Sequence, residues 1–386
     1  DVKAKNNNSY VIYGLDADLL FLALTVPTTD IYLLRESVHL KRESADNLSY
    51  VSIDTMKDLV VSSMNQLIKS ELGDEELSHV PENTELINDF IFICCLIGND
   101  FLPHLPSINI VKKGLDNLLS SYCYTLVTLG GLCCINVKKK ISINQIFLQT
   151  MMKHLGQQEE IVLRESYSGK KWRNRNGGQN DYEREVFRIE NLQFKIKDPI
   201  KLGSDEPEEW RKRYYHHYFH TNDNEIDNYS RRMSEQYYRG MVWVANYYFD
   251  TCPSWNWYYP YDHGPLLVDL SRTLELGKYD ITKEKFTMGK PLEPYMQLLA
   301  VLPPQSAFLL PKSLQKIMLN PKSSLAHLYP TDFRQDFINK GRYWQGIPYL
   351  PPLEIQLIVH AYRKYKNKLS KDELDRSSLK KVYEFE

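Results

Sequence analysis

Residues Tyr10–Asp18 read YVIYGLDAD, and the eight residues that follow read LLFLALTV. Apolar and aromatic side chains dominate Tyr10–Leu15, which predicts a buried strand bounded by Gly14. A tight turn with two aspartates follows, and the second apolar run predicts a helix. Acids beside a buried element cost free energy unless a counter-charge, hydrogen bonds or a metal compensates them. Ligands of open α/β sheets bind at the carboxyl ends of the strands, so we expect Asp16 and Asp18 to bind a divalent cation.

Two structural explanations compete with this metal site. Asp18 precedes a helix-like run, so it could be the N-cap of that helix. Asp16 could close an Asx turn. On these residues alone, the metal site and the structural explanations carry equal weight.

A third acid has a similar setting. The run Leu86–Ile97, LINDFIFICCLI, is apolar almost all round and predicts a buried helix that stops at Gly98. Asp100 lies on the turn that follows. Three carboxylates gathered at one place would repel one another without a cation, and Mg²⁺ prefers such oxygen ligands. Two ions about 3.5–4 Å apart would activate water and stabilise the leaving oxygen of a phosphodiester. The alternative is that Asp100 simply caps the next turn.

The composition limits the class of protein. A chain of 386 residues predicts two domains, and its net charge of −1 creates no overall basic field, so a nucleic acid would be held by local patches. We expect no membrane span, because no apolar window of eighteen residues occurs, and we find no signal peptide. The six cysteines form no C-x-x-C motif and fit buried thiols in a reducing compartment. We therefore expect an intracellular protein and favour the cytoplasm over the nucleus, although no sequence feature separates the two.

Composition shifts along the chain suggest its organisation. Segment 37–50 is polar, and we expect it to be irregular. A helix is expected over 141–155, and the basic, Gly- and Asn-rich composition after it predicts a linker or mobile loop over 164–206. The expected domains are therefore 1–163 and 207–386.

The second of these regions is aromatic. The chain has 27 tyrosines, concentrated between 214 and 261, and Trp255 and Trp257 alternate in the sequence SWNWYYP. Aromatic rings stack on bases of any sequence, at about 1–3 kcal/mol per base. Most aromatics in such a run fill a core instead. The residues that we assign to the core are Trp243, Tyr247, Tyr258 and Tyr259.

Several blocks together resemble one family. YGLDADLLFLAL, LLRESV and GNDFLPHLPSI are followed in order by MVWVANYYFDTCPSWNWYYPYDHGPLLVDL, GKPLEPYMQLLAVLPPQSAFLLP, LYPTDF and WQGIPYLPP. They are similar to consecutive blocks of the Xrn family of 5′→3′ exoribonucleases over roughly residues 9–370. The resemblance implies an α/β fold: part of a PIN/flap-endonuclease-like nuclease core, then a mostly helical, aromatic- and proline-rich second region that braces the active site.

The resemblance also implies an activity. Asp16, Asp18 and Asp100 match acids of the family's site for Mg²⁺ (or Mn²⁺), which orients the scissile phosphate and activates water without a covalent intermediate. The substrate would be single-stranded RNA with a 5′-monophosphate, degraded to mononucleotides, as in mRNA decay. One of Trp255 and Trp257 would lie near the 5′ end of the RNA, with Trp257 slightly preferred. The family loop after these tryptophans usually reads Tyr-Pro-aromatic-His-Tyr-Ala-Pro, whereas this chain has Asp262-His263-Gly264-Pro265 at its end.

In the family, a long N-terminal portion precedes the YGLDAD block and supplies further acids and a basic pocket for the 5′-phosphate. No E-x-E pair and no Lys/Arg cluster of that kind precedes Asp16. We therefore expect either a fragment or subunit completed by that N-terminal portion, or an Xrn-derived RNA-binding scaffold that no longer cuts. A flap-type DNA nuclease is disfavoured because the blocks after residue 237 resemble Xrn proteins in particular.

Overall fold

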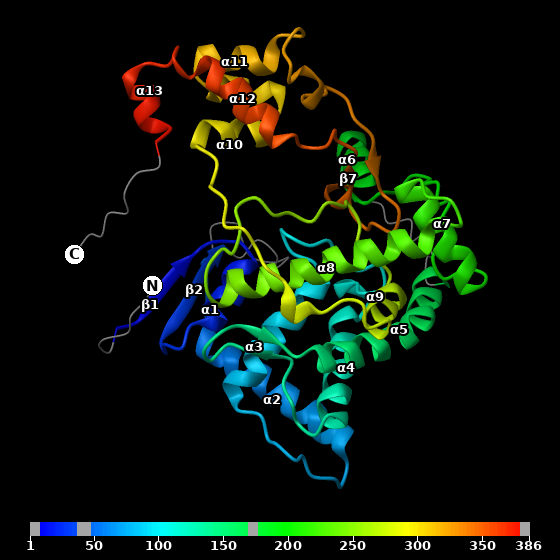
Figure 1. Cartoon of the computed structure of the whole chain (residues 1–386). Coiled ribbons are helices and arrows are strands. Elements are labelled where there is room, and N and C mark those ends of the chain that lie inside the picture. Colours follow the sequence, from blue (N-terminus) through cyan, green and yellow to red (C-terminus); the bar gives the residue numbers. More distant parts are fainter. Residues whose placement is uncertain (1–7, 37–47, 169–176, 379–386) are drawn as a thin grey trace. The chain divides into compact units, whose positions relative to one another are not determined.

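The computed structural model describes residues 8–36, 48–168 and 177–378, which form two compact units (Figure 1). The first unit takes the described residues up to 168 together with 199–288. The second takes 177–198 together with 289–378. Each unit thus combines segments that are far apart in the sequence. The division predicted at 163 and 206 follows the sequence blocks rather than these units, and it stays a prediction.

A three-stranded sheet in the first unit carries the stretch that opens the chain. Its strands β1 (Tyr10–Tyr13), β2 (Ile31–Glu36) and β3 (Leu48–Ser52) lie in that order. β1 and β2 are parallel, with α1 (Asp18–Thr25) between them in sequence, and β3 is antiparallel to β2. The fold of the described residues is therefore mixed α/β, as expected. β3 corrects the expectation for 37–50, because its few residues form a strand only through pairing with β2; residues 37–47 lie outside the described part.

The two faces of this sheet differ. Ile31 and Leu33 are buried on the face against which α1 and α2 pack. The strand register places Tyr13, Leu34 and Tyr50 in one row on the other face. Tyr13 is 62% exposed and Tyr50 65% exposed there. An exposed apolar patch of this kind marks a surface that another part of a protein covers.

Helices build the rest of the first unit (Figure 1). They are α2 (Ile53–Leu72), α3 (Asn83–Cys94), η1 (Cys95–Ile97), η2 (Ile110–Lys112), α4 (Gly114–Thr128), α5 (Gln145–Ser168), α7 (Pro207–Phe219), α8 (Ile226–Phe249), α9 (Leu267–Glu275) and η3 (Ile281–Lys283), with the short strands β4 (Ile135–Asn136) and β5 (Ser142–Ile143).

The expected linker over 164–206 contains helical structure. α5 extends to Ser168, well past the end predicted at 155, and α6 (Asp181–Glu190) lies inside the segment. α6 begins at Asn180, whose side chain accepts the backbone N–H of Glu183 as an N-cap. The polar composition concealed an amphipathic pattern, so the prediction of a linker throughout this segment was wrong.

A buried carboxylate joins three segments of the first unit. Glu159 of α5 accepts the N–H groups of Leu267 and Val268, the first turn of α9, each at 2.9 Å. It also accepts the hydroxyl of Ser107, at 2.9 Å. These bonds satisfy otherwise unpaired N–H groups at a helix N-terminus. Burial nevertheless raises the pKa of Glu159 to about 7.

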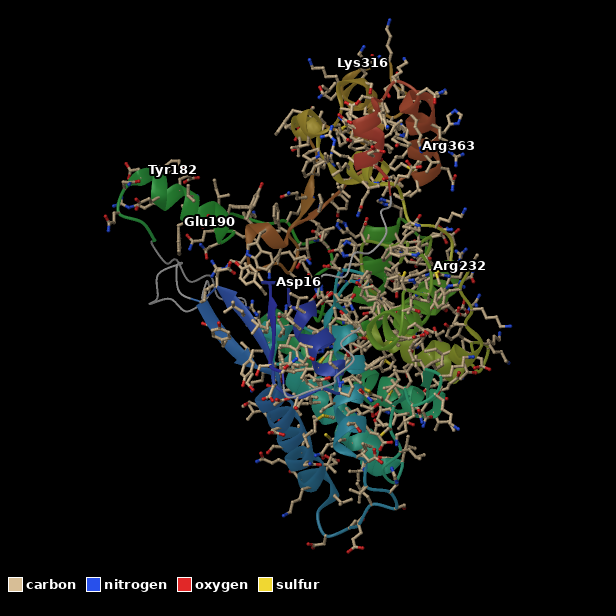
Figure 2. All side chains as sticks on the ribbon, turned by 90° about the vertical axis from the view of Figure 1, so that its left-hand side faces the viewer. Asp16, Tyr182, Glu190, Arg232, Lys316 and Arg363 are labelled. Carbon is tan, nitrogen blue, oxygen red and sulfur yellow. The ribbon has the colours of Figure 1, made fainter. Side chains whose placement is uncertain are left out.

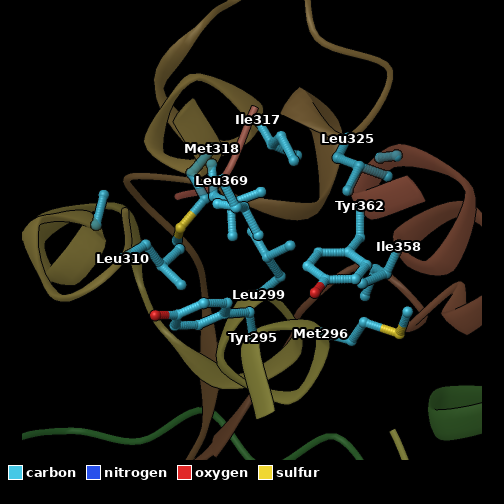
Figure 3. Packing of buried hydrophobic residues seen from close by; sticks show 13 residues of the cluster. Tyr295, Met296, Leu299, Leu310, Ile317, Met318, Leu325, Ile358, Tyr362 and Leu369 are labelled. Carbon is cyan, nitrogen blue, oxygen red and sulfur yellow. The ribbon is translucent and has the colours of Figure 1, made fainter. Parts of the chain in front are cut away.

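The second unit has its own apolar core (Figure 3). Its helices are α10 (Pro294–Val301), η4 (Pro304–Leu309), α11 (Lys312–Leu319), η5 (Ala326–Leu328), η6 (Tyr343–Gln345), α12 (Ile355–Lys366) and α13 (Lys371–Arg376), besides α6 and the paired strands β6 (Gln335–Asp336) and β7 (Ile347–Pro348). Leu299, Leu314 and Ile358 are almost fully buried in that core. None of the helices in the described part of the chain is long and apolar enough to cross a membrane.

Because the pKa of Glu159 is raised on folding, the stability due to this group is complete below about pH 4.5 and is lost as the pH rises through about 7. We expect Glu159→Gln to flatten the fall in unfolding free energy between pH 5 and 7, measured by urea denaturation at several pH values. Glu160→Gln, which changes a half-exposed neighbour paired with Arg164, should leave the slope as it is. A slope that Glu159→Gln does not change would contradict the assignment.

Candidate metal centre

The turn after β1 holds the first two acids. Asp16 Oδ1 accepts the backbone N–H of Asp18 at 3.0 Å, so Asp16 closes an Asx turn. Ala17, and not Asp18, is the N-cap of α1, and Asp18 is the first residue of the helix. The Asx-turn explanation is therefore confirmed for Asp16, and the N-cap explanation is wrong for Asp18. The Asx turn occupies one carboxylate oxygen of Asp16, and its other oxygen takes no part in that bond.

Two side chains of β2 form hydrogen bonds with residues next to the turn of Asp16. Arg35 Nη2 donates to the carbonyl oxygen of Leu15 at 3.2 Å. Its neighbour Glu36 accepts the hydroxyl of Tyr13, and this bond lowers the pKa of Glu36. Both residues thus have the structural role that the sequence suggested for them.

The pKa of Asp18 reports on its neighbours. Burial raises its pKa, a hydrogen bond from the hydroxyl of Tyr248 lowers it, and the negative charges of Asp16 and Asp100 raise it again. The net shift is upward. Since like charges act on a pKa only from nearby, the fold brings the three acids into one neighbourhood.

Asp100 lies on a loop whose shape its neighbours determine. Gly98 has a φ of +99°, and a Cβ there would lie 2.7 Å from the backbone nitrogen of His104. Asn99 Oδ1 accepts the N–H groups of Phe101 and Leu102, each at 2.9 Å. Asn99 therefore caps this turn, and the carboxylate of Asp100 is left exposed.

α8 holds this loop in place. The ring of Phe101 lies 4.6 Å from that of Trp243 and 4.9 Å from that of Tyr247. Tyr237 donates its hydroxyl to the carbonyl oxygen of Pro103 at 3.0 Å. The same helix carries Tyr248, which reaches Asp18. One helix of the aromatic region therefore positions both acidic segments.

The three acids meet one requirement of a metal centre and fall short of another. None of Asp16, Asp18 and Asp100 forms an ion pair with Lys or Arg among the described residues, so their charges are not neutralised by a side chain of that part. However, no group of three or more His, Cys, Asp or Glu in this part stands close enough to hold an ion on its own. Asp16 and Asp100 are exposed and Asp18 is half-buried. Carboxylates that repel one another at such a surface fit a hydrated Mg²⁺, which keeps several waters and takes few protein ligands.

The two tryptophans differ in their surroundings. Trp255 is 55% exposed, and its backbone N–H donates to the carbonyl oxygen of Met288 at 2.7 Å. Trp257 is half-buried, stacked on Trp243 with 5.7 Å between ring centroids and lying edge-on to Phe286 at 6.1 Å. The prediction from the sequence slightly favoured Trp257 for base stacking, but Trp255 is the more exposed of the two rings.

The core assignments in this region are half right. Trp243 and Tyr259 are buried as expected, at 5% and 8% exposure. Tyr247 is 36% exposed and Tyr258 66% exposed. Both were wrong because a run of aromatics in a loop or at a helix end turns some rings outward, and sequence does not say which.

Sequence reasoning missed Tyr248 and Asn99 as parts of this site. Tyr248 is one of many tyrosines, and its contact with Asp18 spans almost the whole first unit in sequence. No spacing or motif signals such a contact. Asn99 could have been found, because an Asn after a helix-ending glycine often caps a turn.

The residues described so far form an acidic neighbourhood in the first unit, and comparisons with known proteins show the family of the chain. A family model described as the Xrn1 helical domain matches residues 82–188 and 174–383. This is more than half of the chain, and the chain belongs to that family. The matched residues include Asp100, α8 and both tryptophans, whereas Asp16 and Asp18 precede them.

Curated relatives extend the similarity to nearly the whole chain. The 5′-3′ exoribonuclease 2 of Candida albicans is 27% identical over 97% of this chain and 51% of its own length. That of Arabidopsis thaliana is 29% identical over 96% of this chain and 46% of its own length. The 5′-3′ exoribonuclease 1 of Homo sapiens is 28% identical over 96% of this chain and 23% of its own length. The resemblance to Xrn exoribonucleases is confirmed. The chain spans about half the length of the first two relatives and less than a quarter of the third.

A substitution at Gly240 of α8 tests whether close packing between this helix and the loop of Asp100 is important. A Cβ at Gly240 would lie 2.5 Å from Leu102 Cδ2 and 2.9 Å from the Trp257 ring. We expect Gly240→Ala to lower the unfolding free energy by about 1–3 kcal/mol through overpacking, measured by urea denaturation. Gly156→Ala is the matched control, because a Cβ there has only ordinary contacts from 3.4 Å and alanine favours the helix by about 0.5–1 kcal/mol. Equal effects of the two changes would show that the close approach at Gly240 is unimportant.

Proposed function

We propose that this chain is part of a metal-dependent 5′→3′ exoribonuclease that degrades single-stranded RNA with a 5′-monophosphate to mononucleotides. The observation that carries the proposal is the acidic neighbourhood of Asp16, Asp18 and Asp100. Burial raises the pKa of Asp18, the charges of Asp16 and Asp100 raise it further, and no described Lys or Arg compensates the three acids. The names of the relatives, 5′-3′ exoribonucleases 1 and 2, support the reaction and its direction.

In this proposal the three acids bind Mg²⁺ or Mn²⁺. The ion would supply the charge that orients the scissile phosphate and lowers the pKa of a water. Asp16, held by its Asx turn, presents its other oxygen. Tyr248 keeps the Asp18 carboxylate in its charged form and in one orientation. The packing of Phe101 on α8 fixes the loop of Asp100.

The exposed ring of Trp255 would stack on a base of the incoming strand. Base stacking is worth about 1–3 kcal/mol and does not depend on sequence, which suits an enzyme that removes every nucleotide in turn. Trp257 would act through the core, because it supports the loop by packing on Trp243 and Phe286.

The site would be completed by a further portion of the nuclease, the N-terminal portion that the family resemblance implies. The open face of the sheet, with Tyr13, Leu34 and Tyr50 in a row, is where that portion would pack. It would bring the remaining ligands to the end of β1, where Asp16 lies in Figure 2. We therefore expect cutting only from the complete protein.

The direct test removes one carboxylate charge at a time from the complete protein. We expect Asp18→Asn and Asp100→Asn each to slow the decay of a 5′-monophosphorylated single-stranded RNA by at least about 100-fold, because each loses a metal ligand. Asp116→Asn changes an exposed acid on α4 and should decay RNA at the normal rate. Near-normal rates for Asp18→Asn and Asp100→Asn would refute the metal site, and RNA binding without any decay by the unchanged protein would point to a scaffold.

The Tyr248 hydroxyl gives a second test with a different readout. Tyr248→Phe removes the hydrogen bond that lowers the pKa of Asp18, so this pKa should rise further. We expect the acid limb of the pH–rate profile to move to higher pH, with a loss of rate of about ten-fold or less at neutral pH. Tyr247→Phe retains the ring that contacts Phe101 and should leave the profile in place. A profile that both variants share with the unchanged protein would exclude Asp18 from the titrating groups.

A further inference from the structure

The net charge of −1 hides a basic region in the second unit. Residues 289–378 contain thirteen Lys and Arg but only seven Asp and Glu. Two long stretches, 294–331 and 355–371, contain no acidic residue at all. They include α11 and α12, which pack against each other.

Four basic side chains on these two helices are exposed and unneutralised. They are Lys312 and Lys316 of α11 and Arg363 and Lys364 of α12. None of the four forms an ion pair in the part of the chain that the structure describes. Figure 2 shows Lys316 and Arg363 on the outer side of their helices. We call these four residues the basic surface.

Two other basic residues at the end of α12 and just past it already have partners. Lys366 donates to both carboxylate oxygens of Glu293, at 2.8 and 2.9 Å. Lys368 lies over the ring of Tyr365, 4.8 Å from its centroid. The four residues of the basic surface have no such partners among the described residues, so their charges are directed to solvent.

The apolar core explains why these charges stand on a fixed scaffold. α12 buries Ile358, Ala361 and Tyr362, and its exposed positions fall on the opposite side at helical spacing. α11 buries Leu314 and Ile317 in the same core. The residues exposed along α12 and just past its end are Gln356, His360, Arg363, Lys364, Asn367 and Lys368.

The chemistry of this surface favours a phosphate backbone over a membrane or a protein. The exposed face of α12 carries no apolar side chain that could insert into a bilayer and no Phe, Tyr or Trp that could anchor a protein partner. Leu319, Phe308 and Leu309 are exposed at or beside α11, and the vesicle measurement below tests them. Spaced, solvated cations are what a nucleic-acid backbone requires. Phe308, 73% exposed in the segment that packs against α11, offers a ring for a single-stranded base.

We propose that the basic surface binds the phosphate backbone of single-stranded RNA, outside the carboxylate site. The choice of RNA rests on the proposed function, whereas the charge and its exposure do not. The surface holds RNA without regard to its end or its sequence. It therefore keeps a long strand on the protein between successive cuts.

The test measures binding without cutting. The probe is a short, fluorescein-labelled circular single-stranded RNA in EDTA, because a circle has no 5′ end to enter an exonuclease site. Fluorescence anisotropy of the complete protein gives its affinity between about 50 and 200 mM salt. The test variant changes the basic surface to glutamine at four positions: Lys312→Gln, Lys316→Gln, Arg363→Gln and Lys364→Gln. The control makes the same change of charge on exposed residues of the first unit: Lys69→Gln, Lys139→Gln, Lys140→Gln and Lys278→Gln.

We expect the test variant to lose affinity by about ten-fold or more at 100 mM salt. Its slope of log affinity against log salt should fall by about 2–3, since each phosphate contact with a single strand contributes about 0.7. The control variant should match the unchanged protein in both quantities. Equal affinity and slope for the test variant and the unchanged protein would overturn the proposal. So would a loss of binding to anionic phosphatidylserine vesicles with RNA binding unchanged.

This design distinguishes a failure of the basic surface from a failure of the proposed metal site. The binding assay requires no metal and no cutting, so an inactive carboxylate site leaves it intact. Decay of a very short 5′-monophosphorylated RNA by the test variant should stay normal, because such an RNA does not extend beyond the carboxylate site. Loss of that decay together with unchanged binding would count against the basic surface and would leave the metal site untouched.

Discussion

Repulsion between carboxylates is the constraint around which the first unit is arranged. Two like charges about 4 Å apart in water repel by about 1 kcal/mol, and by more where water is excluded. The first unit tolerates this repulsion because α8 contacts both acidic segments through side chains that the packing of the unit holds in place. Phe101 packs on Trp243 and Tyr247. Full burial of a large side chain contributes about 1.5–3 kcal/mol, and Phe101 is partly buried, so its packing on α8 offsets a repulsion of this size and holds the loop of Asp100.

Other carboxylates of the same unit show what this fold does with charge that serves structure alone. Asp89 is fully buried and accepts the hydroxyl of Tyr122 at 2.7 Å and the N–H groups of Cys134 and Ile135 at 2.8 Å. Asp269 accepts the guanidinium of Arg211 at 2.7 Å. Each structural carboxylate is matched by donors. The acids at the end of β1 and after η1 have far fewer, and this contrast is the physical reason for assigning them to a ligand.

The sequence predicted the parts of this arrangement that are local. The strand at Tyr10, the buried helix before Gly98 and the turn of Asp100 all follow from apolar periodicity and helix-stop residues, and the structure confirms that they form. The prediction that the strand is buried was wrong, because Val11 and Tyr13 of β1 are more than half exposed. The sequence could not predict β3, which forms a strand only through its pairing with β2, or α6, whose pattern lies in a polar segment. Nor could it find Tyr248, because a hydrogen bond between α8 and α1 leaves no trace in the spacing of either.

The same distinction between local and long-range information applies to charge. A net charge of −1 excludes an overall basic field, but it is an average over two units with different surfaces. The stretches 294–331 and 355–371 carry no acid, while acids gather at the end of β1 and on the loop after η1. Because salt screens charges beyond about 8–10 Å, a bound ion responds mainly to the charges within that distance. The charge that matters for binding is therefore the charge of a local surface, and a protein with almost no net charge carries both a neighbourhood of acids and a surface of unneutralised basic side chains.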